Sequence, residues 1–195
     1  YSAMSLTRGI ELINTDVNEI HHNTVSYSTD GIVQTDATVT NIYNNSFSNH
    51  SNDGLRLETV TAGKIYINTA DTVGKAIYGT EDTTVTEISG NNISNSFSGI
   101  ILETNMPDYD TANSGETIAP YDPGMATNHT KIYSNMFTNI SDVGIGLAGI
   151  NVDEVRTNFG TNMAGFIHSY NSVMGTLEGN MAEGNTMDDG IKLYS

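Results

Sequence analysis

Hydrophobic positions recur along this chain with one long period. Seven times an aliphatic residue stands three positions before an asparagine, and successive asparagines are 22, 23, 23, 44, 23 and 22 residues apart. The pairs are Ile20/Asn23, Ile42/Asn45, Ile65/Asn68, Ile88/Asn91, Ile132/Asn135, Val155/Asn158 and Leu177/Asn180. A constant period in this range predicts one structural unit that is stacked on copies of itself.

Each unit is predicted to carry three short strands. The first ends near the asparagine, as in residues 39–42, and the third begins at a glycine, as in Gly54-Leu55-Arg56-Leu57. Alternation with a period of two is typical of a strand with one buried face. The second strand is predicted at Val25, Phe47, Ile93 and Phe137.

The spacing decides between two all-β folds. Short strands at such intervals are also typical of a β-sandwich. Asparagines that stay in register over a constant unit favour a solenoid instead, in which each unit is one coil. We therefore predict an all-β fold, a right-handed parallel β-helix of about eight coils of 22–23 residues, with residues 1–195 forming a single domain.

The asparagines themselves are predicted to be structural. In a solenoid, equivalent positions stack at the strand spacing of ~4.8 Å. A column of side-chain amides both donates and accepts, so it can bond along the axis and to the turn backbone. Asp30, Asp53 and Asp189 each precede a glycine, which indicates a turn, although a stacked acidic column would suit Ca²⁺. We predict no other metal and no cofactor.

Charge narrows the range of partners. Seven Lys and Arg residues oppose 23 Asp and Glu residues, which gives a formal net charge of −16. This balance argues against nucleic acid and anionic membranes, and less strongly against a polyanionic substrate. The sequence has no run of 18 apolar residues, so membrane insertion is not expected. It has no cysteine, which excludes disulfides and thiolate metal sites.

One interval of the repeat is doubled. Between Asn91 and Asn135 the stretch 104–127 holds all three prolines, together with Tyr109 and Tyr121. Proline does not suit a central stacked strand, so an inserted loop is predicted here. A degenerate coil is the alternative, because Asn113 falls in register. Loops on a rigid scaffold often carry function, so the two tyrosines are candidate substrate-binding residues.

A first outward face follows from the alternation in the strand that ends at the asparagine. His21, Tyr43 and Tyr66 fall on successive rungs (one rung is one coil at a given position), and Lys64 lies beside them. A row of rings would give a flat apolar platform for sugar rings, with polar neighbours for hydroxyl groups. Cross-strand pairing that only stabilises the sheet is the alternative, at ~0.2–1 kcal/mol for each pair.

A second outward face follows from the glycine-led strand. It carries Arg56, Glu58, Tyr78 and Glu103 on three successive rungs, directly before the doubled interval. Glu58 and Glu103 would be two rungs apart, about 9–10 Å at the backbone. This distance is near the upper end of the carboxylate separation in inverting glycosidases. These four residues are the candidate catalytic set. The remaining histidines, His22, His50, His129 and His168, have no metal-ligand spacing and are predicted at turns or on the surface.

The repeat from Val39 to Phe47, continuing through Gly54-Leu55-Arg56-Leu57, resembles the parallel β-helix repeats of carbohydrate-binding and sugar-hydrolase proteins. That class includes pectate- and alginate-lyase-like enzymes, mannuronan epimerases, phage tailspikes, NosD-like proteins and archaeal disaggregatases. The resemblance covers nearly the whole chain as a repeat. The catalytic signatures of polygalacturonases and epimerases are absent as sets, so no catalytic residue is carried over.

The resemblance implies an extracellular or cell-surface protein that acts on a polysaccharide, as a lyase or a glycoside hydrolase. Two alternatives stay open: a non-catalytic glycan-binding module of a cell or virion surface, and a structural spacer within a longer solenoid. Flanking coils, domains or subunits are expected at both ends, because an uncapped coil exposes apolar side chains and unpaired strand edges. Tailspike-like β-helices commonly form trimers, and a homotrimer is compatible with this sequence.

Overall fold

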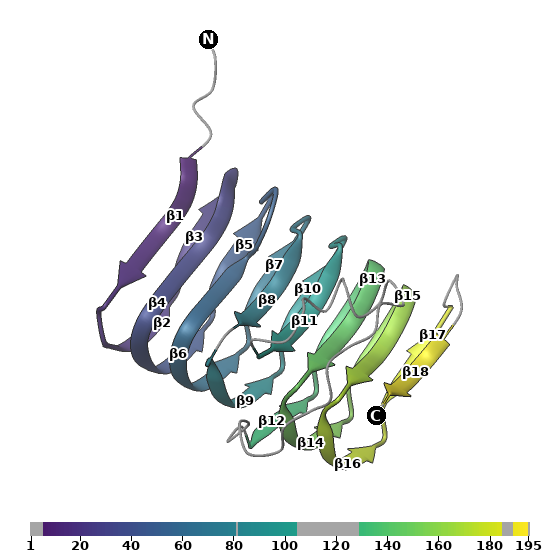
Figure 1. The fold of residues 1–195 in the computed structure, drawn as a ribbon. Coiled ribbons are helices and arrows are strands. Elements are labelled where there is room, and N and C mark those ends of the chain that lie inside the picture. The colour runs from purple at the N-terminus through teal and green to yellow at the C-terminus, as the bar shows by residue number, and fades with distance from the viewer. Residues whose placement is uncertain (1–5, 81, 105–128, 185–188, 195) are drawn as a thin grey trace.

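The computed structural model describes residues 6–80, 82–104, 129–184 and 189–194. The described chain winds through about seven turns that stack along one axis, from the N-terminal purple end to the C-terminal yellow end (Figure 1). Every strand pairing among the described residues is parallel. The predicted all-β parallel β-helix is therefore confirmed.

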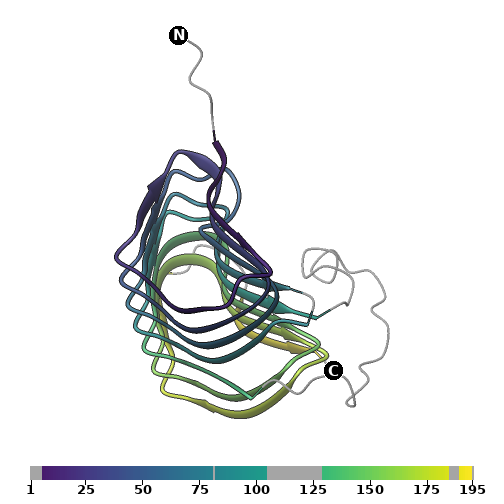
Figure 2. The same cartoon turned by 90° about the vertical axis from the view of Figure 1, so that its left-hand side faces the viewer.

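Each turn contributes to three sheets, which Figure 2 shows superposed around a common interior. Sheet A holds the strands that end before the repeated asparagines. Its strands are β2 (Val17–His21), the end of β4 (Ser28–Tyr43), the end of β6 (Leu55–Tyr66), β9 (Thr84–Ser89), β12 (Thr130–Tyr133), β14 (Asn151–Arg156) and β16 (Val173–Glu178).

Sheet B holds the shortest strands, which follow the asparagines. They are β3 (Thr24–Ser26), β5 (Ser46–Ser48), β7 (Thr69–Asp71), β10 (Asn92–Ser94), the start of β13 (Met136–Ala148), the start of β15 (Phe159–Tyr170) and β17 (Met181–Glu183). The strands of this sheet carry Val25, Phe47, Ile93 and Phe137 inward, as predicted.

Sheet C holds the glycine-led strands. It consists of β1 (Leu6–Ile13), the starts of β4 and β6, β8 (Lys75–Thr80), β11 (Ser98–Glu103), the ends of β13 and β15, and β18 (Asp189–Tyr194). The described part of the chain contains no helix long and apolar enough to cross a membrane.

Stacked apolar columns fill the interior. On sheet A the column that starts at Ile20 continues through Ile42, Ile65 and Ile88, and all four side chains are buried. Three phenylalanines are the largest fully buried side chains: Phe47, Phe137 and Phe166. Each buried aliphatic or aromatic side chain stabilises the fold by about 1.5–3 kcal/mol relative to an exposed one.

The asparagine column forms a hydrogen-bonded ladder, as the sequence predicts. Asn68 Nδ2 donates to Asn91 Oδ1 at 3.0 Å and to the Ile42 carbonyl at 3.0 Å. The backbone N–H of Asn68 donates to the same Asn91 Oδ1 at 2.9 Å. The pattern repeats along the axis from Asn23 to Asn180. Each amide thus satisfies backbone groups of its own turn and of the preceding turn.

The doubled interval does not interrupt the stack. Asn91 Nδ2 donates to Asn135 Oδ1 at 2.9 Å, and β9 pairs directly with β12. Tyr133 is therefore one rung from Ser89, although 44 residues separate them. The predicted inserted loop 104–127 lies outside the described residues except for Thr104.

The prediction of turn or surface positions for the histidines is wrong for His168, which lies within β15, whereas His50 lies between β5 and β6. His50 and His168 are buried, with 4% and 6% of their area exposed. His50 Nδ1 lies 3.0 Å from Ser28 Oγ across one rung. The corner between sheets B and C encloses this ring, which sequence spacing alone does not reveal.

Candidate functional site

A column of aromatic side chains runs along the outer face of sheet A. The register places His21, Tyr43, Tyr66, Ser89 and Tyr133 on successive rungs. The His21 and Tyr43 rings are stacked with centroids 4.9 Å apart, and the Tyr43 and Tyr66 rings with centroids 5.0 Å apart. We call His21, Tyr43 and Tyr66 the aromatic ladder.

The ladder does not form the flat platform that the sequence predicts. The Tyr43 and Tyr66 ring planes are nearly parallel, at 8°, and the rings lie face to face along the axis. Rungs ~4.8 Å apart are too close for rings to lie flat beside one another, so the rings stack. Their edges therefore point to solvent, and a free ring face exists only where the stack is interrupted.

The local backbone explains why the rings gather at this edge. The residues that directly follow His21, Tyr43, Tyr66 and Ser89 have positive φ angles: 56° at His22, 52° at Asn44, 54° at Ile67 and 61° at Gly90. The next residue in each coil is the repeated asparagine, so every coil turns sharply here. Each ring is consequently fixed at the end of a strand, directly outside the asparagine ladder.

The stack is interrupted at Ser89. Tyr43 covers one face of Tyr66, and the guanidinium of Arg156 lies 5.2 Å from the Tyr133 ring centroid on the far side of Tyr133. Among the described residues, the rung between Tyr66 and Tyr133 carries the small residues Ser89 and Gly90 at this edge. A groove of about 510 Å³ opens at this point, and we call it the ring slot. It is lined by Asn41, Lys64, Tyr66, Ile67, Glu87, Ser89, Gly90, Tyr133 and Ser134.

A bridged carboxylate borders the ring slot. Glu87 Oε2 lies 3.1 Å from Lys64 Nζ, and Ser89 Oγ donates to Glu87 Oε1 at 2.9 Å. Desolvation acts to raise the pKa of Glu87, but hydrogen bonds from Tyr133, Lys64 and Ser89 outweigh it and keep that pKa below its ordinary value. The hydrogen bond to Glu87 raises the pKa of Lys64. The slot therefore carries a fixed carboxylate and a fixed ammonium group at neutral pH.

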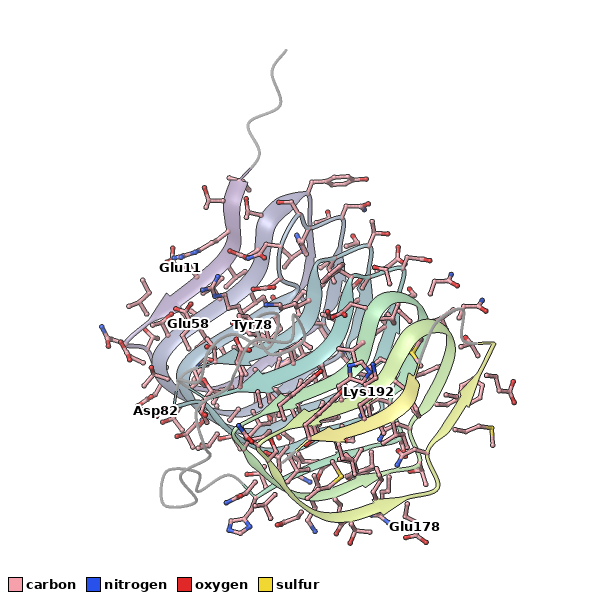
Figure 3. The ribbon with its side chains drawn as sticks, turned by 45° about the vertical axis from the view of Figure 1, so that its right-hand side comes forward. Glu11, Glu58, Tyr78, Asp82, Glu178 and Lys192 are labelled. Carbon is pink, nitrogen blue, oxygen red and sulfur yellow. The ribbon has the colours of Figure 1, made fainter. Side chains whose placement is uncertain are left out.

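The predicted catalytic residues lie together on the outer face of sheet C. Figure 3 labels two of them, Glu58 and Tyr78. Arg56 Nη2 lies 2.5 Å from Glu58 Oε1, and the Arg56 guanidinium is 5.8 Å from the Tyr78 ring centroid. The Tyr78 hydroxyl donates to Glu103. Because Glu58 pairs with Thr80 and Leu102 pairs with Gly79, Glu58 and Glu103 are two rungs apart, as expected. We call Arg56, Glu58, Tyr78 and Glu103 the polar cluster.

Asp53 adjoins the polar cluster and was missed in the sequence, where Asp-Gly indicates a turn. Its side chain is buried with 1% of its area exposed, and Oδ2 lies 4.0 Å from Arg56 Nη1. Burial raises the pKa of Asp53 to about 7, with a further contribution from Asp30, against the lowering effect of Lys75 and Arg56. The signal available in the sequence was the repetition of aspartate at Asp30 and Asp53 on adjacent rungs.

An apolar patch adjoins Tyr78 on the outer face of sheet C. Four buried side chains on later rungs form a cluster against which Tyr78 packs: Ile101, Val143, Ala148 and Tyr170. The polar cluster thus borders an apolar patch, while His168 and Lys192 follow in the register column of Tyr78. Such surroundings strengthen electrostatic interactions within the cluster.

The remaining predictions concern two tyrosines of the doubled interval, metal ligands and the extent of the binding set. Tyr109 and Tyr121 lie outside the described residues. Within the parts of the chain that the structure describes, no three His, Cys, Asp or Glu side chains come together as metal ligands. Glu87, Ser89 and Tyr133 are additions to the predicted binding set. Glu87 and Ser89 are one ordinary period from Lys64 and Tyr66, whereas Tyr133 lies across the doubled interval.

Comparison with known proteins identifies one family. The sequence matches the family described as right handed beta helix region over residues 3–114, which is more than half of the chain. Neither the curated proteins nor the solved structures gave a match. The family agrees with the parallel coils described above.

Proposed function

Since this chain belongs to the right-handed β-helix family, we propose that it binds a neutral polysaccharide outside the cell or on a cell surface. The observation that carries the proposal is the ring slot, where Tyr66 and Tyr133 each have one face covered and the other turned to the gap. Aromatic faces beside a few fixed polar groups are the usual composition of a small-ligand site. The net charge of −16 favours a neutral glycan over an acidic one.

Substitution of Tyr66 by alanine is expected to weaken polysaccharide binding about tenfold, because it removes one of the two free ring faces. The measurement is retardation in native gels that contain a neutral glucan, mannan or galactan. Tyr27 provides a matched variant, since 73% of its area is exposed and it lies outside the ladder. Equal retardation of the Tyr66→Ala and Tyr27→Ala proteins would refute this role for the slot, and wild-type protein that no neutral gel retards would refute the function.

Cleavage at the polar cluster is a second candidate function. It is favoured by the continuous contacts from Glu58 through Arg56 and Tyr78 to Glu103, with the buried carboxyl of Asp53 beside them. A carboxyl group whose pKa lies near neutrality, as the pKa of Asp53 does, is suited to proton donation. A hydrolase would release reducing ends, and a lyase would produce unsaturated uronates that absorb in the ultraviolet.

If the cluster is catalytic, Tyr78→Phe and Glu103→Gln should each lower the cleavage rate by about 10²-fold or more, the range of general acid–base contributions. Glu178→Gln, at an exposed carboxylate on sheet A, should leave the rate unchanged. Both assays are run on a panel of neutral and acidic polysaccharides. Cleavage that persists in both cluster variants would remove these residues from the reaction, and wild-type protein inactive on the whole panel would leave binding as the function.

A further inference from the structure

We propose, resting on the function above, that the ring slot takes the terminal residue of a neutral glycan chain and not an internal one. The height of the slot is the first reason. Tyr66 and Tyr133 are two rungs apart, or ~9.6 Å at twice the strand spacing. The ladder itself spaces rings at 4.9 and 5.0 Å. One six-membered ring at the rung of Ser89 therefore continues the stack, one ring spacing from each tyrosine.

One side of the slot is closed. The Lys64 ammonium on the rung of Tyr66 is 3.1 Å from Glu87 Oε2 on the rung of Ser89. The Tyr133 hydroxyl on the following rung also bonds to Glu87. These contacts connect all three rungs on the strand side of Ser89. A glycan chain cannot continue through this side without breaking the Lys64–Glu87 pair.

The opposite side of the slot is open. It lies over Gly90, which has a φ of +61° and no side chain. Among the described residues, a Cβ at this position would meet Ile67 Cγ1 alone, at 3.8 Å. The equivalent residues on the two adjacent rungs are Ile67 and Ser134, so Gly90 leaves a gap between two side chains. A glycosidic bond can leave the slot on this side, which we call the exit and which lies away from the Lys64–Glu87 pair.

The polar groups of the pocket fit hydroxyl groups. The Glu87 carboxylate accepts hydrogen bonds, the Lys64 ammonium donates them, and Ser89 Oγ does both. The apolar faces of a pyranose ring would lie against Tyr66 and Tyr133, with its hydroxyl edge toward Glu87. A nucleotide would place a phosphate in the field of a chain with a net charge of −16. The pocket therefore favours a neutral hexopyranose residue.

Two substitutions test the slot and its exit separately. Ser89→Tyr would complete the column with a ring that stacks as Tyr43 does between its neighbours, and so fill the slot. Gly90→Asn would place a side chain at the exit in a backbone conformation that Asn44 already adopts in the same column. Ser26→Tyr, the same substitution at an exposed position of β3 on sheet B, leaves the slot empty and serves as the matched variant. Circular dichroism verifies that each variant keeps the β-helix.

The probes are methyl glycosides of glucose, galactose and mannose, their tetrasaccharides, and adenosine, titrated by ligand-observed NMR. Ser89→Tyr is expected to weaken the binding of methyl glycosides and of tetrasaccharides by about tenfold or more, because the sugar loses its contacts with both tyrosine rings. Ser26→Tyr should change the affinity for either probe by less than about threefold, a difference of under 1 kcal/mol. Gly90→Asn should weaken the binding of the tetrasaccharides and leave the binding of the methyl glycosides unchanged.

The inference is overturned if Ser89→Tyr binds like the wild type, if Gly90→Asn affects both probes equally, or if adenosine binds more tightly than every glycoside. Neutral polysaccharide that retards the wild type but not Tyr66→Ala, together with no methyl glycoside binding, would overturn the terminal-residue inference and leave the proposed function intact. Absence of any polysaccharide binding by the wild type would overturn both.

Discussion

Replacing Asn91 with alanine is expected to lower the free energy of unfolding by about 3–5 kcal/mol. Asn91 has 1% of its area exposed, and its Oδ1 accepts both the N–H and the Nδ2 of Asn68. Its own Nδ2 donates to the Ile65 carbonyl at 3.1 Å and to Asn135 Oδ1 at 2.9 Å. Alanine leaves these partners buried without a hydrogen bond, and each such group costs about 1–3 kcal/mol. Urea unfolding followed by circular dichroism measures the loss.

The neighbouring residue provides the matched variant. Asn92 is an exposed strand residue of the same type, so Asn92→Ala should change the free energy of unfolding by less than about 0.5 kcal/mol. A comparable loss from both substitutions would mean that side-chain bonds along the axis do not hold the coils together. The fold would then depend on the apolar columns and the backbone pairing alone.

Asp53→Asn is expected to stabilise the protein at pH 8 by an amount of up to about 4 kcal/mol. The pKa of Asp53 is about 7 in the folded chain, against an ordinary 3.8, chiefly because burial disfavours the charged carboxylate. That difference corresponds to about 4 kcal/mol at about 1.36 kcal/mol for each pH unit. The folded chain holds the proton more tightly than the unfolded chain does. The resulting stabilisation is complete below pH 4 and is lost as the pH rises from about 4 to about 7.

The advantage of the asparagine variant should therefore be absent near pH 4, where Asp53 is protonated, and should grow to its full value above pH 7. Thermal unfolding of both proteins at pH 4, 6 and 8 measures it. Asp71→Asn should instead destabilise the protein by a nearly constant amount at these three pH values, because hydrogen bonds from Ser94 and Asn95 lower the pKa of Asp71 and the resulting stabilisation is lost only below about pH 4. If the stability difference between Asp53→Asn and the wild type is the same at pH 4, 6 and 8, the result would contradict a buried carboxyl group that titrates in this range.

The fold could be predicted from the sequence because the positions that define it recur with a constant period. The asparagines reported the register, and that register placed Tyr43 beside Tyr66 and Glu58 two rungs from Glu103. Each of these relations depends only on a constant coil length. The interior columns followed for the same reason, since alternation within a strand fixes which side chains point inward.

The binding site was harder to predict from the sequence, because it depends on which residues become neighbours in space. Tyr133 is beside Ser89 because β12 pairs directly with β9, although 44 residues separate the two positions in the sequence. The change from a flat platform to stacked rings follows from the ~4.8 Å rung spacing, which is shorter than the width of a ring. The raised pKa of Asp53 required its burial, which a turn motif does not encode.

Saturation-transfer NMR tests the central claim, glycan binding between Tyr66 and Tyr133, most directly. Irradiation of the aromatic protons in the presence of soluble neutral oligosaccharides is expected to transfer saturation to the ring C–H protons of one sugar residue. The transfer should persist in Tyr27→Ala and disappear in Tyr66→Ala and Ser89→Tyr. Transfer that is unchanged in these two variants, or that is absent for every neutral oligosaccharide, would contradict it.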